Sequence, residues 1–152
     1  MASADRTWSR LPNLVVGAGF VVLLAACSDG SNPESTEILK SVVQATRVPQ
    51  KVTTIVIDGD LSGIPAASSP LLPPVRRGAS DLERTTTSLK PGELAIVGFH
   101  QDGDEARVKT RSVTAATHRP GSALDCGTAQ TFVLRRGPQG DWTVVEIQGL
   151  NC

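Results

Sequence analysis

The 152-residue chain contains no tyrosine, and its other aromatic residues are three phenylalanines and two tryptophans. Aromatic rings supply the stacking faces and cation-binding faces of many ligand sites. Their scarcity argues against a site that stacks sugars and against an aromatic cage for a quaternary ammonium group.

An excess of one charge is also missing. Lysine and arginine together number 15, and aspartate and glutamate together also number 15. Domains that bind nucleic acid usually carry a clustered excess of basic residues. We therefore predict no nucleic-acid partner.

The short motifs of common enzyme classes are absent: Gly-x-Ser-x-Gly, Ser-x-x-Lys, His-Glu-x-x-His, Gly-x-Gly-x-x-Gly and the P-loop. The two histidines, His100 and His118, lie 18 positions apart, and zinc sites need three or four ligands. Asp102 and Asp104 have the spacing of calcium-loop ligands, but the alternation of oxygen ligands stops there. We predict that the protein is not an enzyme and holds no metal or cofactor.

A hydrophobic run long enough to cross a membrane is missing as well. Residues 14–24 form an apolar run of eleven residues that follows Arg6 and Arg10, whereas a spanning helix needs about 20. A basic segment followed by a short apolar run is typical of a signal segment that is removed on export.

This run ends in Leu24-Ala25-Ala26-Cys27, which resembles the lipobox of bacterial lipoproteins: a branched apolar residue, two small residues and a cysteine. The resemblance implies that residues 1–26 are a cleaved signal peptide. Cys27 is then diacylated on its sulfur and acylated on its amine, with chains such as palmitate, and several chains anchor a protein stably to a membrane. Ser28 resembles the outer-membrane sorting signal, which implies the periplasmic face of the outer membrane if the host has two membranes. The alternative is an ordinary secretory signal followed by an incidental cysteine.

Once Cys27 is lipidated, Cys126 and Cys152 remain as an even pair in an exported protein, which favours a disulfide. The bridge would close a loop of about 27 residues and stabilise the fold by about 3–4 kcal/mol. The alternative is a redox or nucleophilic thiol, although the sequence has no Cys-x-x-Cys.

Residues 27–32 form a short lipidated tether, and residues 33–152 suit a single domain. Asn32 is a typical N-cap and Pro33 a typical first helical residue. Together with apolar residues at helical spacing, they predict an amphipathic helix over residues 33–47. The apolar residues are Ile38, Leu39, Val42 and Val43.

The remaining chain predicts strands and one more helix. The four later strands form two hairpins that turn at residues 101–104 and 137–141. Residues 80–83 (Ser-Asp-Leu-Glu) match a capping box and predict a short second helix. The predicted fold is α+β: an N-terminal helix and a short second helix packed on a curved antiparallel sheet of four to five strands. The predicted strands are 52–58, 93–100, 105–113, 131–136 and 142–148.

The last hairpin, Thr-Phe-Val-Leu-Arg-Arg at 131–136 and Gly-Asp-Trp-Thr-Val-Val-Glu-Ile at 140–147, resembles the closing strands of small NTF2-like and cystatin-like lipoprotein domains. The resemblance implies a curved sheet packed on helices. It also implies an alternative function, an envelope domain that binds or hydrolyses a small ligand, with His100 and Asp58 lining the pocket.

Residues 60–78 form a proline-rich insert, and long irregular inserts are usually functional or disordered. Pro70, Pro73 and Pro74 favour an extended polyproline helix that a partner protein can bind. Arg76 and Arg77 follow them and complete this candidate partner-binding segment. The alternative is a solvated loop without a partner.

Arg107, Lys109 and Arg111 alternate along one predicted strand, so their side chains project from one face of the sheet. Such a face suits anionic headgroups or a polyanionic wall polymer. It equally suits the solvated face of a half-buried sheet. The inward side chains would then be Val108, Thr110 and Ser112.

These patterns predict a membrane-anchored envelope lipoprotein without catalytic activity that serves as a protein-binding or assembly factor. The predicted partners are membrane lipid, through the acyl chains on Cys27, and another protein of the envelope.

Overall fold

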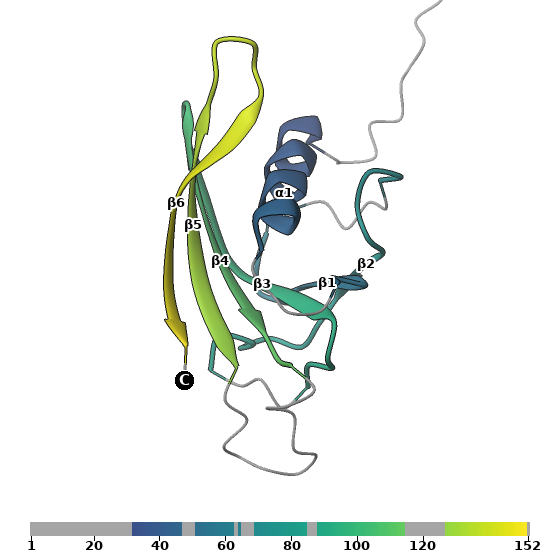
Figure 1. Cartoon of the computed structure of the whole chain (residues 1–152). Coiled ribbons are helices and arrows are strands. Elements are labelled where there is room, and N and C mark those ends of the chain that lie inside the picture. Colours follow the sequence, from purple (N-terminus) through teal and green to yellow (C-terminus); the bar gives the residue numbers. More distant parts are fainter. Residues whose placement is uncertain are drawn as a thin grey trace, which may run out of the picture.

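A computed structural model of the chain describes residues 32–46, 51–62, 64, 69–84, 88–114 and 127–151 (Figure 1). Cys27, Cys126 and Cys152 lie outside the described residues. None of the described helical structure is long and apolar enough to cross a membrane. The elements are α1 (Pro33–Ala45), β1 (Thr54–Ile57), β2 (Val75–Arg77), β3 (Glu93–Asp102), β4 (Glu105–Ser112), β5 (Thr128–Arg136) and β6 (Trp142–Asn151).

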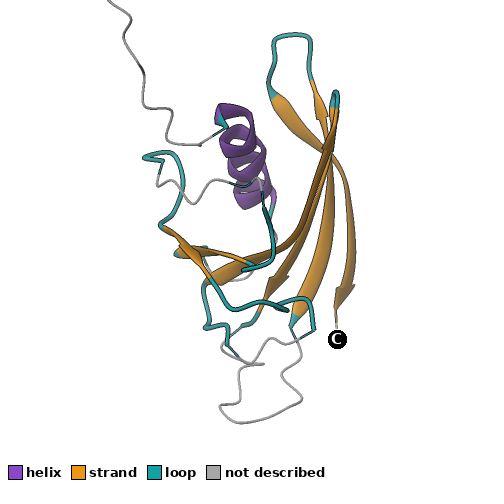
Figure 2. Ribbon diagram, turned by 180° about the vertical axis from the view of Figure 1, so that it is seen from behind, coloured by secondary structure: helices purple, strands orange, loops and turns teal. Residues whose placement is uncertain are grey.

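The strands form one open sheet in the order β2-β1-β3-β4-β5-β6. From β3 to β6 the neighbours are antiparallel, whereas β1 is parallel to both β2 and β3. Helix α1 lies in the curve of this sheet, as views from opposite sides show (Figures 1 and 2). The α+β class is confirmed, but the expected antiparallel sheet of four to five strands is wrong in detail, because the described sheet has six strands and is mixed.

Strand β2 is the element that the sequence did not predict, and it comes from the proline-rich insert. It is three residues long and pairs with β1 alone. The carbonyl of Pro74 accepts the N–H of Ile55 at 2.9 Å. Prolines are tolerated beside this strand because it lies at the edge of the sheet. After β2 the chain crosses back to the end of the sheet at which β1 and β2 begin. Strand β3 therefore runs parallel to β1.

Helix α1 forms where the sequence predicts it. The side chain of Asn32 accepts the N–H of Glu34 at 3.0 Å, and Pro33 occupies the first turn. At the other end, Thr46 has left the helical conformation and its hydroxyl donates to the carbonyl of Val42 at 2.7 Å. The buried face of the helix consists of Ser35, Ile38, Leu39 and Val42.

The main core lies between α1 and the sheet. Alternate residues of each strand point into it, and a smaller second cluster covers the opposite face of β1 and β3. The main cluster contains Ile38, Leu39, Val42, Val52, Ile55, Ile57, Ile64, Leu94, Ile96, Ala106, Val108, Phe132, Leu134 and Trp142. The second contains Val56, Leu82, Leu89, Ala95 and Val113.

The predicted second helix is wrong for the residues of that segment that the structure describes. Residues 80–84 form turns. Asp81 has a φ of 72°, a left-handed conformation that interrupts a right-handed helix. The N–H of Leu82 donates to the Asp58 carboxylate at 2.7 Å, so a side chain distant in sequence binds the backbone of this segment where a helix would be capped locally by Ser80. Glu83 instead forms an ion pair with Lys109 at 3.4 Å.

Both predicted hairpins are confirmed. The turn between β3 and β4 contains Gly103 with a φ of 55°, and the turn between β5 and β6 contains Gly140 with a φ of 86°. The second turn is closed by a bond from the N–H of Gly137 to the carbonyl of Asp141 at 2.7 Å.

Candidate functional site

The predicted partner-binding segment forms a turn followed by an edge strand. The N–H of Leu72 donates to the carbonyl of Ser69 at 3.0 Å, and the N–H of Leu71 donates to the Ser69 hydroxyl at 3.3 Å. Pro70 is exposed, and Leu71 is 59% exposed. Leu72, by contrast, packs against the main core. The turn therefore presents one apolar side chain to solvent while its neighbour is held in the protein.

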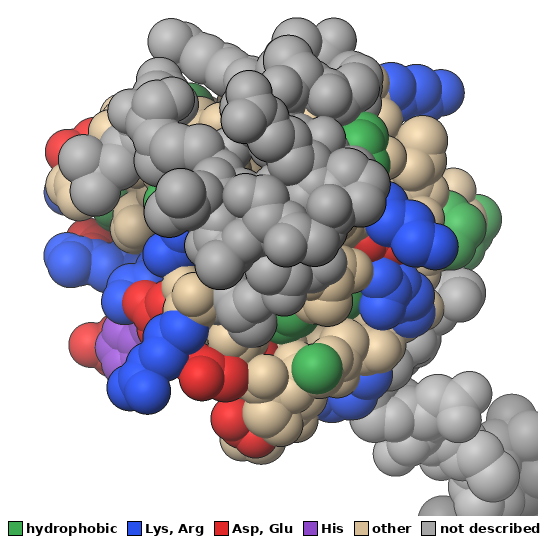
Figure 3. Space-filling model, turned by 90° about the horizontal axis from the view of Figure 1, so that it is seen from below, with side chains coloured by type: hydrophobic (Ala, Val, Ile, Leu, Met, Phe, Trp, Pro, Cys, Tyr) green, Lys and Arg blue, Asp and Glu red, His purple; other side chains and the backbone are tan. Residues whose placement is uncertain are grey.

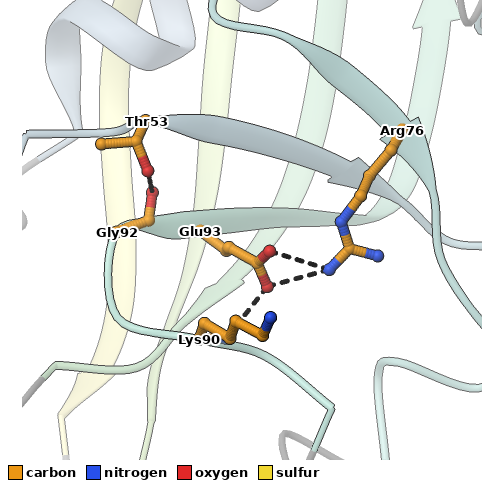
Figure 4. A network of polar contacts seen from close by, with 5 residues as sticks. All are labelled: Thr53, Arg76, Lys90, Gly92 and Glu93. Atoms are coloured by element: carbon orange, nitrogen blue, oxygen red, sulfur yellow. Dashed lines mark hydrogen bonds and ion pairs between the residues drawn. The ribbon is translucent and has the colours of Figure 1, made fainter.

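Arg76 of this segment is bound within the protein. Its guanidinium donates from Nη2 to both carboxylate oxygens of Glu93, at 2.8 and 2.9 Å (Figure 4). The N–H of Lys90 donates to the same carboxylate at 2.9 Å. The Glu93 side chain is 10% exposed and that of Arg76 is 44% exposed. This network fastens β2 to the start of β3.

Arg77 binds the beginning of the insert, at residues 61 and 64. Its Nη1 donates to the carbonyl of Leu61 at 2.6 Å and its Nη2 donates to the carbonyl of Ile64 at 3.2 Å. The described contacts of both arginines in the predicted segment are therefore intramolecular. Pro70, Leu71 and Pro74 are the exposed residues of the turn that precedes them.

The basic residues of β4 lie on the sheet face opposite α1. Along β4 the side chains alternate between buried and accessible, with Val108, Thr110 and Ser112 buried, as the sequence pattern predicts. Arg107 forms an ion pair with Glu105 at 3.0 Å. Seen from below, the described surface shows basic side chains beside acidic ones (Figure 3).

A hollow of about 390 Å³ opens on this outer face. Its floor comes from β4, β5 and β6, and Glu83 and Val97 lie at its β3 side. Arg111 makes no ion pair with any residue that the structure describes, whereas Lys109 pairs with Glu83. The described lining residues are Glu83, Val97, Lys109, Thr110, Arg111, Ala129, Gln130, Thr131, Gln148 and Gly149.

His100 and Asp58, the residues expected in an NTF2-like pocket, have no contact with each other. His100 is exposed on β3, opposite Arg107. Asp58 is 5% exposed, and its two oxygens accept the N–H groups of Asp60 at 3.0 Å and Leu82 at 2.7 Å. The space between α1 and the sheet, where such a pocket would lie, is filled by the apolar core.

Asp102 and Asp104 lie exposed at the β3–β4 turn. His118 lies outside the described residues. Among the residues that the structure describes, no group of three or more His, Cys, Asp or Glu side chains is placed to hold a metal ion.

The hollow was not predicted from the sequence. The alternation of basic residues along β4 identified Lys109 and Arg111, but Thr131 and Gln148 join them only through the register of β5 and β6. Glu83 arrives from a turn whose conformation was predicted wrongly. Only the basic alternation carried a signal of this site.

Comparison with protein-family models, curated proteins and solved structures found no match for this chain.

Proposed function

We propose that this protein is a bacterial envelope lipoprotein, anchored through acyl chains on Cys27, that binds a partner protein and has no catalytic activity. The lipobox residues support the anchor. Between Cys27 and the N-cap Asn32, the tether has four residues, 28–31, which span about 14 Å when extended. The domain would thus stay close to the membrane surface, where tethering raises its effective concentration for a partner on the same surface.

The observation that carries the binding role is the exposed turn of the proline-rich insert. Leu71 and Val145 are the large hydrophobic residues most exposed in the described structure, at 59% and 53%. Two contacts hold the chain that follows Leu71: Leu72 packs against the main core, and Arg76 forms an ion pair with Glu93. A contact surface that is already ordered loses little conformational entropy on binding. We therefore assign partner contact to the turn of Pro70 and Leu71.

The anchor is tested by metabolic labelling with a palmitate analogue. The wild-type protein should take up the label and fractionate with membranes. The Cys27→Ala variant should do neither, because it lacks the sulfur that is acylated. Equal labelling of both proteins would refute the proposed anchor.

The binding role is tested by in-cell crosslinking followed by affinity capture and mass spectrometry. Leu71→Asp should abolish capture of a discrete envelope protein, since it places a charge where an apolar contact forms. Val145→Thr is the matched control, because it changes a similarly exposed apolar residue on β6. A partner that is captured equally by the wild type and by Leu71→Asp would contradict the assignment. Thermal unfolding of both variants should match the wild type, which separates lost contact from lost folding.

A further inference from the structure

The hollow on the outer sheet face has features of a small-molecule site that the proposed partner binding does not use. It lies on the face opposite α1, away from the turn of Pro70 and Leu71. Its volume of about 390 Å³ falls in the usual range for small-ligand pockets, about 300–1,000 Å³. Ala129, a short side chain, lies directly opposite Arg111, which leaves space next to the guanidinium.

Two cationic groups face this space. Lys109 and Arg111 are two positions apart on β4, which places them on the same face at a spacing of about 7 Å. Arg111 is half-buried and has no ionic partner among the described residues. A guanidinium in such a position is suited to two parallel hydrogen bonds with a carboxylate or phosphate.

Neutral groups complete the wall. Thr131 lies opposite Lys109, and Gln148 lies opposite Thr131, so the three side chains form one row across β4, β5 and β6. Directly opposed side chains in antiparallel strands are about 5 Å apart. The Thr131 hydroxyl can donate to an anion held by the cations. The Gln148 amide donates one N–H to Glu146 at 2.9 Å, and its second N–H can donate to the same anion. Val97 provides an apolar surface for the rest of the molecule.

The single acidic residue among the described lining residues does not block an anion. Glu83 pairs with Lys109 at 3.4 Å, but their side chains are 56% and 57% exposed. Ion pairs this exposed contribute little to stability, so an incoming anion can replace Glu83 at little cost. Lys109 is also held in place from the β3 side, because its aliphatic chain lies over Gly98, where an added Cβ would come within 3.1–3.3 Å of it.

We propose that this hollow binds a small organic anion through a phosphate or carboxylate group held between Lys109 and Arg111. The hollow is remote from the end of the domain that joins the tether. Arg136 of β5 lies at that end, because it forms an ion pair with Glu34 in the first turn of α1 at 3.1 Å. From Arg136 to Ala129 in the hollow, β5 rises about 23 Å. This separation favours a small anion over a headgroup of the anchoring membrane.

The test is a titration of the full-length protein, purified in an uncharged detergent, with three probes: glycerol 3-phosphate, succinate and, as the neutral control, glycerol. Backbone amide shifts in NMR spectra report where each probe binds. Saturable shifts of Ala129, Thr131 and Gln148 with glycerol 3-phosphate or succinate, but not with glycerol, are expected. The stronger of the two identifies the anionic group.

Arg111→Gln should weaken that binding by about tenfold or more, because a charge-assisted hydrogen bond is lost. Arg107→Gln is the matched control: it removes a cation from the same strand and face, but one outside the hollow that already pairs with Glu105. It should change affinity less than about twofold.

Three results would overturn the proposal. These are no saturable binding of either anion up to about 10 mM, equal loss in the Arg107→Gln and Arg111→Gln variants, and binding to phosphatidylglycerol vesicles that Arg111→Gln weakens, without binding to either small anion. None of these measurements depends on the lipid anchor or on a partner protein, so the proposed function can fail or stand independently.

Discussion

The ion pair that fastens the proline-rich insert yields the sharpest prediction. Arg76→Met removes the guanidinium and keeps most of its aliphatic length. The carboxylate of Glu93, whose side chain is only 10% exposed, then keeps a single described hydrogen bond, from the N–H of Lys90 at 2.9 Å. A carboxylate that loses its partner in a site with little water is destabilised.

The expected magnitude lies between two known limits. Breaking a fully buried ion pair costs about 3–5 kcal/mol, and an exposed pair contributes about 0–1 kcal/mol. Here the carboxylate is nearly buried, but the guanidinium is 44% exposed, so water screens the pair. We expect Arg76→Met to lower the free energy of unfolding by about 2 kcal/mol.

A double-mutant cycle isolates the interaction. Glu93→Gln removes the charge but keeps a side-chain oxygen for the Lys90 N–H. In the Arg76→Met, Glu93→Gln double variant no unpaired carboxylate remains. The double variant should therefore lose about 1 kcal/mol less than the sum of the two single variants.

Urea denaturation followed by circular dichroism and by the fluorescence of Trp142 measures each free energy of unfolding. Trp142 is buried in the main core, which makes it a suitable reporter. Additive losses, with a coupling energy near zero, would refute the argument that this pair holds the insert. A loss under about 0.5 kcal/mol in Arg76→Met would place the pair among screened surface ion pairs.

Two further predictions concern stability. Asp58→Ala should cost about 1–3 kcal/mol in urea denaturation, because it leaves the buried N–H of Leu82 without its 2.7 Å acceptor; Asp60→Ala, at an exposed neighbour, should change stability little, and equal effects would contradict this role. The predicted disulfide of Cys126 and Cys152 should appear as a mass increase of about 2 Da on reduction, the mass of two hydrogens. Reduction should lower the free energy of unfolding by about 3–4 kcal/mol. Free thiols in the untreated, membrane-derived protein would refute the disulfide.

The parts of the fold that the sequence predicts well are those with local causes. Helix α1 has a cap, Asn32, next to the first turn and an apolar stripe within thirteen residues. The β3–β4 hairpin is encoded by Asp102 and Gly103 at its turn. In both cases the residues that determine the structure are neighbours in the chain, so a pattern of a few residues is sufficient.

The parts that the sequence predicts poorly have distant causes. The capping box at 80–83 failed because Asp58, 24 positions away, binds the N–H of Leu82 and Asp81 adopts a positive φ. Strand β2 exists because β1 offers it a free edge, and its three residues carry no periodicity. The same applies to the hollow: the basic alternation on β4 was visible, but the register that adds Thr131 and Gln148 was not.

The packing of α1 on β6 sets the order in which this fold can be completed. The Ser41 hydroxyl on α1 donates to the carbonyl of Trp142 at 2.7 Å, across 101 positions of sequence, and β1 must be enclosed by β2 and β3, which both follow it. Contacts this distant slow folding. In a chain exported N-terminus first, as the proposed function requires, the apolar stripe of α1 would therefore stay partly uncovered until the last strand arrives. A chaperone that shields this stripe, or fast translocation of the last strand, would then decide how much of the protein reaches its folded state.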